Sequence, residues 1–197
     1  MFLEFIFYFG GYIVRLILVP VGTSLKEKEE IKSERGSVYP KDVGEEHLGN
    51  EGIIENIIEI LDSLDIQLEI DKRNNKKYGN NSDQFSAEIS SLLLFLSKEE
   101  KAINIEGNRI IKNKNFDYKI KLLISDTPQS EFCARVVQGY FTRELNDLIK
   151  NNDLIKINSL SEDGSKFNKG LKNLLTEVNS LVHNNEYEEI IFNITSG

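Results

Sequence analysis

The chain has 197 residues, of which 40% are hydrophobic and 28% are charged, a composition that suits one globular domain with a sizeable core. Its formal net charge of -8 argues against binding of long nucleic acid through a general positive field, so local groups must bind any phosphorylated ligand. The single cysteine of the sequence, Cys133, excludes an internal disulfide and paired-cysteine zinc sites, which favours a reducing, cytoplasmic setting.

Residues 1–14 contain an apolar stretch from Phe5 to Val14. This stretch is too short to cross a bilayer, and it lacks both the basic start and the cleavage site of a signal peptide. It is either an extra strand or a segment upstream of the fold, and we favour the second interpretation. We therefore assign residues 1–14 to an N-terminal extension and residues 15–197 to the domain, and we expect no association with membranes.

The first predicted strand of the domain is an aliphatic run that leads into three small residues, Gly22, Thr23 and Ser24. Residues 26–50 are charged and almost free of apolar side chains, which predicts a long loop. A helix is expected over residues 53–64, because the isoleucines and leucines of this segment fall on one helical face.

Residues 71–83 are polar and rich in asparagine, which predicts a second loop. We expect Ser82 or Asp83 to cap the next helix, which an apolar stripe places over residues 85–98. A Gly-Asn pair between two short β-like runs then predicts a small hairpin over residues 103–112.

The second half of the chain alternates between strands and helices. Strands are predicted over 118–126, 154–160 and 188–197, and amphipathic helices over 127–149 and 165–182. This alternation predicts βαβ units with right-handed crossovers. The expected fold class is α/β, with a Rossmann-like, mainly parallel sheet and helices on both of its faces.

Three of the predicted strands end in small, polar residues. These are Gly22, Thr23 and Ser24 after the first strand, Ser125, Asp126 and Thr127 after the second, and Asn193, Thr195, Ser196 and Gly197 after the last. Parallel strands share their carboxyl edge, so we expect the three groups to lie on one rim. A turn or a helix cap explains each group alone, since Asp126 or Thr127 could cap the helix that has Pro128 in its first turn. Together they suggest an uncharged cradle of amides and hydroxyls for a small phosphorylated ligand.

Signs of other chemistry are weak. No G-x-G-x-x-G follows a predicted strand and no P-loop pattern occurs in the sequence. We interpret His47 and His183 as surface residues, and Cys133 as a core residue, because it lies on the apolar stripe of its helix. The sequence also has no cluster of metal-ligating residues, so we expect neither a metal nor a cofactor.

Five segments occur in the order found in a known family: "VGTSL", "AEISSLLLFL", "KLLISDTPQSEFCARVVQGYF", "INSLSEDGSKFNKGLKNLL" and "IIFNITSG". From Arg15 onward the chain resembles the CRISPR-associated Rossmann-fold (CARF) proteins, particularly the branch that includes the ring nucleases. It departs from the family at Gln129 and Ser130, where an acidic residue and a glycine are usual, and at Ser196, where the family has a glycine. The family continues beyond the last motif with an aromatic residue, a lysine and further elements, so we expect the domain to be truncated at Gly197.

The resemblance implies a homodimer that binds a cyclic oligoadenylate, the second messenger of type III CRISPR defence, with the tetra-adenylate favoured over the hexa-adenylate. Carried over by position, the ligand contacts would come from Gly22, Thr23, Ser24, Ser125, Asp126, Thr127, Asn193, Thr195, Ser196 and Gly197. The resemblance also implies metal-independent cleavage with Ser24 as the catalytic residue, although the missing lysine counts against turnover by this chain. Two alternatives are a pure sensor that controls an effector, such as an RNase, a DNase or a transcription regulator, and an unrelated module for another nucleotide or sugar phosphate.

Overall fold

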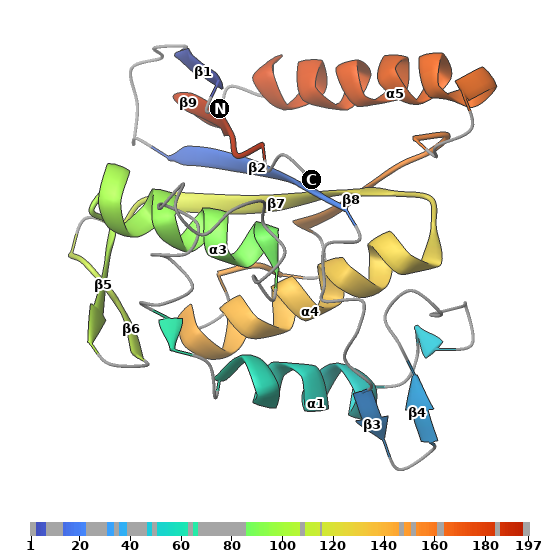
Figure 1. Ribbon diagram of the computed structural model, residues 1–197. Helices are drawn as coiled ribbons and strands as arrows, with labels where there is room; N and C mark the ends of the chain where they lie inside the picture. The colour runs from blue at the N-terminus through green and yellow to red at the C-terminus, as the bar shows by residue number, and fades with distance from the viewer. Residues whose placement is uncertain are drawn as a thin grey trace, which may run out of the picture.

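The computed structural model describes residues 3–6, 14–22, 31–33, 36–38, 47–48, 51–62, 65–66, 86–106, 109–114, 116–145, 148–150, 153–160, 164–183 and 186–194. Within these ranges, a five-stranded sheet lies between helices on its two faces (Figure 1). None of the helices in these ranges is both long and apolar enough to span a bilayer.

The sheet contains β1 (Leu3–Ile6), β9 (Glu189–Phe192), β2 (Arg15–Val21), β7 (Tyr118–Ser125) and β8 (Leu154–Ile157), in that spatial order. The last four of these strands run parallel to one another, while β1 is antiparallel to β9 at the edge. The central strands are rich in Ile, Leu and Val and buried on both faces, as is typical of a parallel sheet covered by helices. The predicted Rossmann-like α/β class is therefore confirmed.

The edge strand β1 lies in the segment that the sequence assigns to an N-terminal extension. Its residues pair with β9 from Leu3 opposite Phe192 to Ile6 opposite Glu189. Leu3–Ile6 is thus an extra strand of the sheet. The interpretation that we favoured, a segment upstream of the fold, was wrong for these residues. The apolar run alone could not decide between an extra strand and an upstream segment, because the strand that β1 pairs with lies far away in the sequence.

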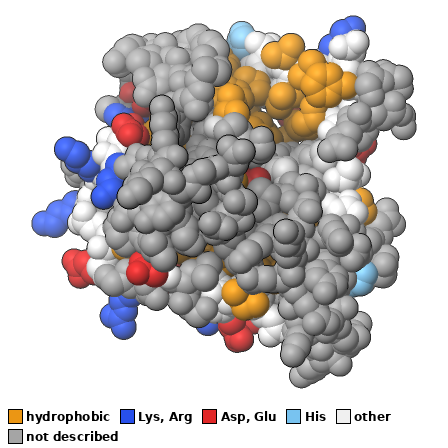
Figure 2. Space-filling view, viewed as in Figure 1, with side chains coloured by type: hydrophobic (Ala, Val, Ile, Leu, Met, Phe, Trp, Pro, Cys, Tyr) orange, Lys and Arg blue, Asp and Glu red, His pale blue; other side chains and the backbone are white. Residues whose placement is uncertain are grey.

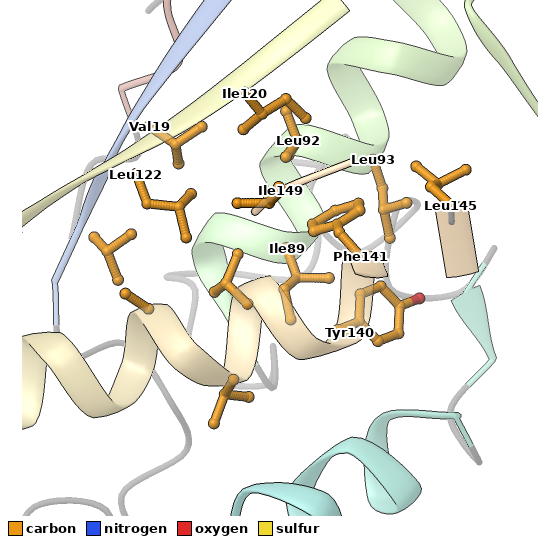
Figure 3. Packing of buried hydrophobic residues seen from close by; sticks show 14 of the residues in the cluster. Val19, Ile89, Leu92, Leu93, Ile120, Leu122, Tyr140, Phe141, Leu145 and Ile149 are labelled. Atoms are coloured by element: carbon orange, nitrogen blue, oxygen red, sulfur yellow. The ribbon is translucent and has the colours of Figure 1, made fainter. Parts of the chain in front are cut away.

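One face of the sheet is covered by α4 (Pro128–Leu145), α3 (Ala87–Leu94) and the π-helical η4 (Phe95–Glu99). Helix α1 (Glu51–Asp62) packs against α4 on the side away from the sheet (Figure 1). The main core forms between these layers, and Figure 3 shows Val19 and Leu122 of the sheet in one buried cluster with Leu92 of α3 and Phe141 of α4. Each large apolar side chain buried there stabilises the fold by roughly 1.5–3 kcal/mol.

Helix α5 (Gly164–His183) lies on the other face of the sheet (Figure 1). Leu174 and Val178 of this helix pack against a second cluster that includes Leu16 of β2. The outer part of the same apolar stripe stays exposed, with Leu175 at 66% and Phe167 at 47%. Figure 2 shows hydrophobic side chains gathered at the top of the view, where α5 lies in Figure 1. The sheet therefore covers only part of the apolar face that the sequence predicts for α5.

Among the described residues, two hairpins lie outside the main sheet. The predicted one is confirmed as β5 (Ile103–Glu106) paired with β6 (Arg109–Lys112). The other, β3 (Ile31–Ser33) paired with β4 (Gly36–Val38), lies inside the predicted loop of residues 26–50, so that prediction was wrong there. β3 also lies against α1, and strands of three residues are too short to show an alternating apolar pattern in the sequence.

The helix α3 is capped by Ser86, whose hydroxyl accepts a hydrogen bond from the Ile89 amide. This corrects the predicted caps, Ser82 and Asp83, which lie outside the described residues together with the predicted loop of residues 71–83. Ser86 lies closer to the first buried residue of the helix, and a cap has to precede the first turn directly.

Candidate functional site

The carboxyl ends of β2 and β7 lie side by side at one edge of the sheet. Val21 pairs with Ile124, so Gly22 follows beside Ser125, while Ser125 itself pairs with Ile157 of β8. We call this edge the rim and define it by Gly22, Ser125, Asp126, Thr127 and Asn193. The structure thus brings together strand ends that are far apart in the sequence, as the parallel topology predicts.

Asn193 lies deeper than the rest of the rim. Phe192 pairs with Leu18, and the Asn193 amide donates to the Leu18 carbonyl at 2.9 Å. At about 3.3 Å per residue, β9 therefore ends roughly 10 Å before the end of β2. Asn193 is fully buried, whereas Gly22 is exposed. The last strand thus supplies the floor of the rim rather than its outer edge.

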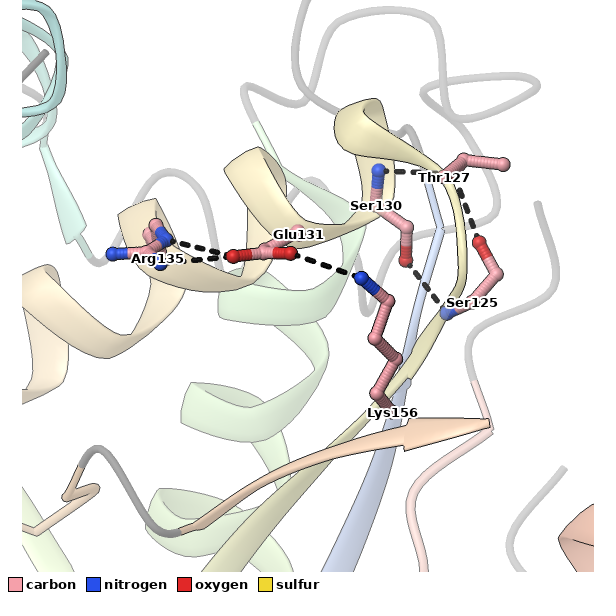
Figure 4. Close-up of polar contacts among 6 residues, drawn as sticks. All are labelled: Ser125, Thr127, Ser130, Glu131, Arg135 and Lys156. Atoms are coloured by element: carbon pink, nitrogen blue, oxygen red, sulfur yellow. Dashed lines mark hydrogen bonds and ion pairs between the residues drawn. The ribbon is translucent and has the colours of Figure 1, made fainter. Parts of the chain in front are cut away.

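The corner between β7 and α4 is closed by hydroxyl groups (Figure 4). The Thr127 hydroxyl accepts a hydrogen bond from the Ser130 amide at 3.3 Å and lies 2.9 Å from the Ser125 hydroxyl. Pro128 begins α4, where its missing N–H removes no helical hydrogen bond. Thr127 therefore acts as the helix cap, which was one of the two caps expected from the sequence.

Ser130 joins the two central strands at the rim. Its hydroxyl donates to the Val21 carbonyl at 2.9 Å and accepts from the Ser125 amide at 3.1 Å. The side chain is buried, at 2% exposure. The sequence analysis noted this residue only as a departure from a family pattern. Its spacing was the available signal, since it is the third residue after the Thr127 cap, on the inner face of the first turn.

Asp126 contacts the corner between β8 and α5. Its Oδ2 accepts a hydrogen bond from the Ser159 amide at 3.0 Å. Ser159 has a φ of 65°, a left-handed conformation that is uncommon for a residue with a side chain. Asp126 therefore holds a turn in place, and this contact uses one oxygen of its carboxylate.

Glu88 of α3 lies buried directly behind Gly22. Its Oε1 accepts a hydrogen bond from the Gly22 amide at 3.0 Å, and its Oε2 accepts one from the Ser86 hydroxyl at 3.0 Å. Glu88 is 2% exposed. Sequence reasoning missed this residue, and the one available signal was an acidic residue in the first turn of an apolar helix.

One turn further along α3, Ser91 reaches the end of β9. Its hydroxyl donates to Asn193 Oδ1 at 2.7 Å, and both residues are buried. The Asn193 Nδ2 has no hydrogen-bond partner within the part of the chain that the structure describes. The floor of the rim is therefore polar, with an amide group inside it.

Charged side chains flank the rim on the side of β8 (Figure 4). Glu131 of α4 contacts Arg135 at 2.8 Å and Lys156 of β8 at 3.4 Å. The hydrogen bond from Arg135 lowers the pKa of Glu131, against the opposing effect of burial, and Lys156 lowers it further. The carboxylate therefore stays ionised at neutral pH, next to a half-exposed lysine.

A different cluster of polar residues lies at the opposite ends of the strands, where β2 and β7 begin. Arg15 donates to Glu100 at 2.6 Å and to the Tyr118 hydroxyl at 2.7 Å, and it forms an ion pair with Glu189 at 2.9 Å. The Tyr118 hydroxyl in turn donates to Glu100. Burial raises the pKa of Tyr118 above its ordinary value, and the bond to Glu100 raises it further. These contacts join β2, β7, β9 and the end of η4 away from the rim.

Several predicted site residues, Thr23, Ser24, Thr195, Ser196 and Gly197, lie outside the described residues. Among the residues that are described, no group of three His, Cys, Asp or Glu side chains is placed to hold a metal ion. Cys133 is buried in the main core and His183 is exposed at the end of α5, which confirms these two interpretations, whereas His47, also interpreted as a surface residue, is half-buried.

The family model described as "CRISPR-associated protein (Cas_APE2256)" matches residues 83–197. The chain belongs to this CRISPR-associated family. The Cas_APE2256 match includes α3 with Glu88, the whole corner from Ser125 to Ser130, and Asn193, whereas Gly22 precedes it. No curated protein matches the chain. The association with CRISPR that the sequence resemblance implied is therefore confirmed.

Proposed function

We propose that this CRISPR-associated protein binds a cyclic oligoadenylate at the rim, as part of type III CRISPR defence. The observation that carries the proposal is the position of Gly22 beside Ser125 at the carboxyl edge of a parallel sheet. Ligands of open parallel sheets bind beyond this edge, where loops separate and helix N-termini point outward. The family match supports a role in CRISPR systems, and the resemblance to CARF proteins supplies the class of ligand.

The rim offers hydroxyl and amide groups to a phosphate. The Ser125 and Thr127 hydroxyls share one hydrogen bond, so the proton of the second hydroxyl can be donated to a ligand. The N-terminus of α4 adds the positive end of its dipole. Lys156 adds a cation at the flank, which matters in a chain whose net charge is -8. These features favour a compact anion over an extended nucleic acid.

We further propose that two copies of the chain face each other across a two-fold axis. A ring of four adenylates has the same symmetry, so one ligand would contact both rims equally. Thr23 and Ser24 would contact the ring phosphates, and Thr195, Ser196 and Gly197 would complete the cradle around Asn193. The tetra-adenylate is favoured over the hexa-adenylate.

Cleavage of the ring would need no metal. The protein would hold a ribose 2'-OH in line with the neighbouring phosphate, while Ser24 and backbone amides stabilise the added charge. The 2'-oxygen then bonds to phosphorus, the 5'-oxygen leaves with a proton, and the product carries a 2',3'-cyclic phosphate. Ser24 is the proposed catalytic residue of this ring nuclease reaction.

The test combines binding and product analysis. Labelled cyclic tetra-adenylate and hexa-adenylate are incubated with the purified protein in EDTA, beside Ser24→Ala and, as a control, Thr176→Ala on the exposed side of α5. We expect the wild type and the control to bind the tetra-adenylate equally. Linear products that disappear in Ser24→Ala establish a ring nuclease, whereas tight binding without products establishes a sensor.

The same experiment can overturn the proposal. Failure of the folded protein to bind either ring, together with binding of a mononucleotide, would assign the rim to another nucleotide phosphate. Light scattering of the free protein and of the ligand mixture tests the dimer separately.

A further inference from the structure

We infer that Glu88 is a positioning residue, whose buried carboxylate fixes the path by which the chain leaves β2 at the rim. Glu88 and Gly22 are 66 positions apart in the sequence, and their hydrogen bond joins the first turn of α3 to the end of a central strand. The consequence for ligand binding rests on the proposed function, while the effect on Gly22 can be measured without any ligand.

The contacts of Glu88 leave its carboxylate well bound. It accepts from the Gly22 amide and from the Ser86 hydroxyl, and Ser86 is itself buried as the cap of α3. A buried carboxylate is costly unless hydrogen bonds compensate for its lost hydration, and bonds to an ionised acceptor are among the stronger ones. The hydrogen bonds from the Gly22 amide and the Ser86 hydroxyl therefore hold the Glu88 carboxylate in this position.

This hydrogen bond directs the Gly22 amide toward the interior. Because Glu88 Oε1 accepts this hydrogen bond, it holds the N–H that a phosphate would otherwise attract. On this strand, the groups offered to an anion therefore begin after Gly22. Thr23 is bonded directly to Gly22, so the orientation of the Gly22 backbone determines the direction in which the chain continues.

The same helix fixes the neighbouring strand end. Ser91 lies three positions after Glu88, on the same side of α3, and donates to Asn193 at the end of β9. One buried helix face thus holds the ends of two adjacent parallel strands. A rotation of α3 would move both of them together, which couples the two sides of the proposed cradle.

A negative charge on Glu88, behind a site proposed for an anion, would oppose the binding of that anion. The positioning role therefore rests on the hydrogen bonds and not on the charge. Glu88→Gln separates the two effects, because its amide oxygen still accepts from Gly22 while the charge is removed. Glu88→Ala removes both, and Glu88→Asp keeps the charge but shortens the reach.

Two measurements test the inference. Hydrogen exchange of the Gly22 amide, followed by NMR, reports the contact directly, and the dissociation constant of cyclic tetra-adenylate reports its effect on the rim. We expect Glu88→Ala to speed Gly22 exchange and to weaken ligand binding by about tenfold each, as for loss of a hydrogen bond to a charged group. Glu88→Gln should exchange as the wild type does and bind at least as tightly.

The matched control is Glu100→Ala, at the opposite edge of the sheet. Glu100 is partly buried and bound by Arg15 and Tyr118, so its removal destabilises the fold without touching the rim. We expect the ligand affinity of Glu100→Ala to equal that of the wild type. Equal weakening by the two alanine variants would overturn the inference, because general destabilisation would then explain both.

Slow exchange of Gly22 in Glu88→Ala would also overturn the inference, whatever the ligand result. If Glu88→Ala does not fold, Glu88→Asp takes its place, with faster Gly22 exchange as the expected result. Failure of the wild type to bind any cyclic oligoadenylate overturns the proposed function alone, and Gly22 exchange then decides the role of Glu88.

Discussion

The Ser130 hydroxyl donates a hydrogen bond to the carbonyl of Val21 at 2.9 Å, across 109 positions of the sequence. The same oxygen accepts from the Ser125 amide, so one small side chain satisfies a main-chain group on each of two neighbouring strands. Both strands end there, where the regular ladder of the sheet stops. Ser130 therefore replaces sheet hydrogen bonds at the point where the rim begins.

Ser130→Ala should lower the free energy of unfolding by about 1–3 kcal/mol, because it leaves the Val21 carbonyl and the Ser125 amide without their partner. Urea unfolding followed by circular dichroism measures the change. Thr176→Ala is the control, since its hydroxyl bonds to Lys172 on an exposed helix surface, and we expect a change within about 0.5 kcal/mol. Equal losses in the two variants would contradict the bridging role.

Thr127→Ala should cost about 1 kcal/mol of stability, because the cap of α4 loses its acceptor for the Ser130 amide. Thr127→Ser keeps the hydroxyl and should stay close to the wild type. Thermal or urea unfolding of the three proteins provides the comparison. A serine variant as unstable as the alanine variant would show that the methyl group, and not the cap, is what matters.

Gly170→Ala should destabilise the protein more than Gly139→Ala. A Cβ on Gly170 would lie 2.3 Å from the Ser159 carbonyl oxygen, which belongs to a backbone that cannot easily move. A Cβ on Gly139 would meet the end of the flexible Ile58 side chain at 2.4 Å. Overpacking typically costs about 1–3 kcal/mol, against a gain of about 1 kcal/mol from replacing glycine within a helix. Unfolding midpoints of the two variants test this order.

Stability should fall as the pH rises from about 10 to 12. Burial, with a further contribution from the nearby Glu186, raises the pKa of Tyr187 from 10.0 to about 12. The folded state then holds a proton that the unfolded state has lost, so the free energy of unfolding decreases through this range. The contribution of Tyr187 is complete below pH 10 and is lost as the pH rises through the folded pKa.

Tyr187→Phe tests this effect, because phenylalanine has no proton to lose. We expect its free energy of unfolding to fall less between pH 9 and pH 12 than that of the wild type, as measured by urea unfolding at a series of pH values. The raised pKa of Tyr118 leaves part of the decline in place. Identical slopes in the two proteins would show that Tyr187 ionises equally easily in both states.

The sequence predicts the layered part of the fold well, since strands such as β7 and helices such as α4 carry their own periodic patterns. It fails where a structure depends on a distant partner. The strand β1 pairs with β9, and the short hairpin of β3 and β4 lies against α1. Neither relationship leaves a periodic mark on the sequence.

The candidate site shows the same division. The rim could be predicted because parallel strands share one carboxyl edge, and Thr127 because caps have a preferred position. Glu88 could not, because its role depends on Gly22, far away in the chain. The depth of Asn193 was also hidden, since it follows from the register of β9 against β2 and not from local composition.

The position of β2 in the sheet has a consequence for synthesis on the ribosome. This strand comes early in the chain, yet its two neighbours, β7 and β9, are made much later. Both edges of an apolar strand therefore emerge from the ribosome without partners, and such edges invite pairing with other chains. Because β9 completes the pairing of β2 and also receives β1, the sheet can close only after β9 has been made. Until β9 is released, collapse of the main core or a chaperone would have to shield the edge of β2 that β9 later covers.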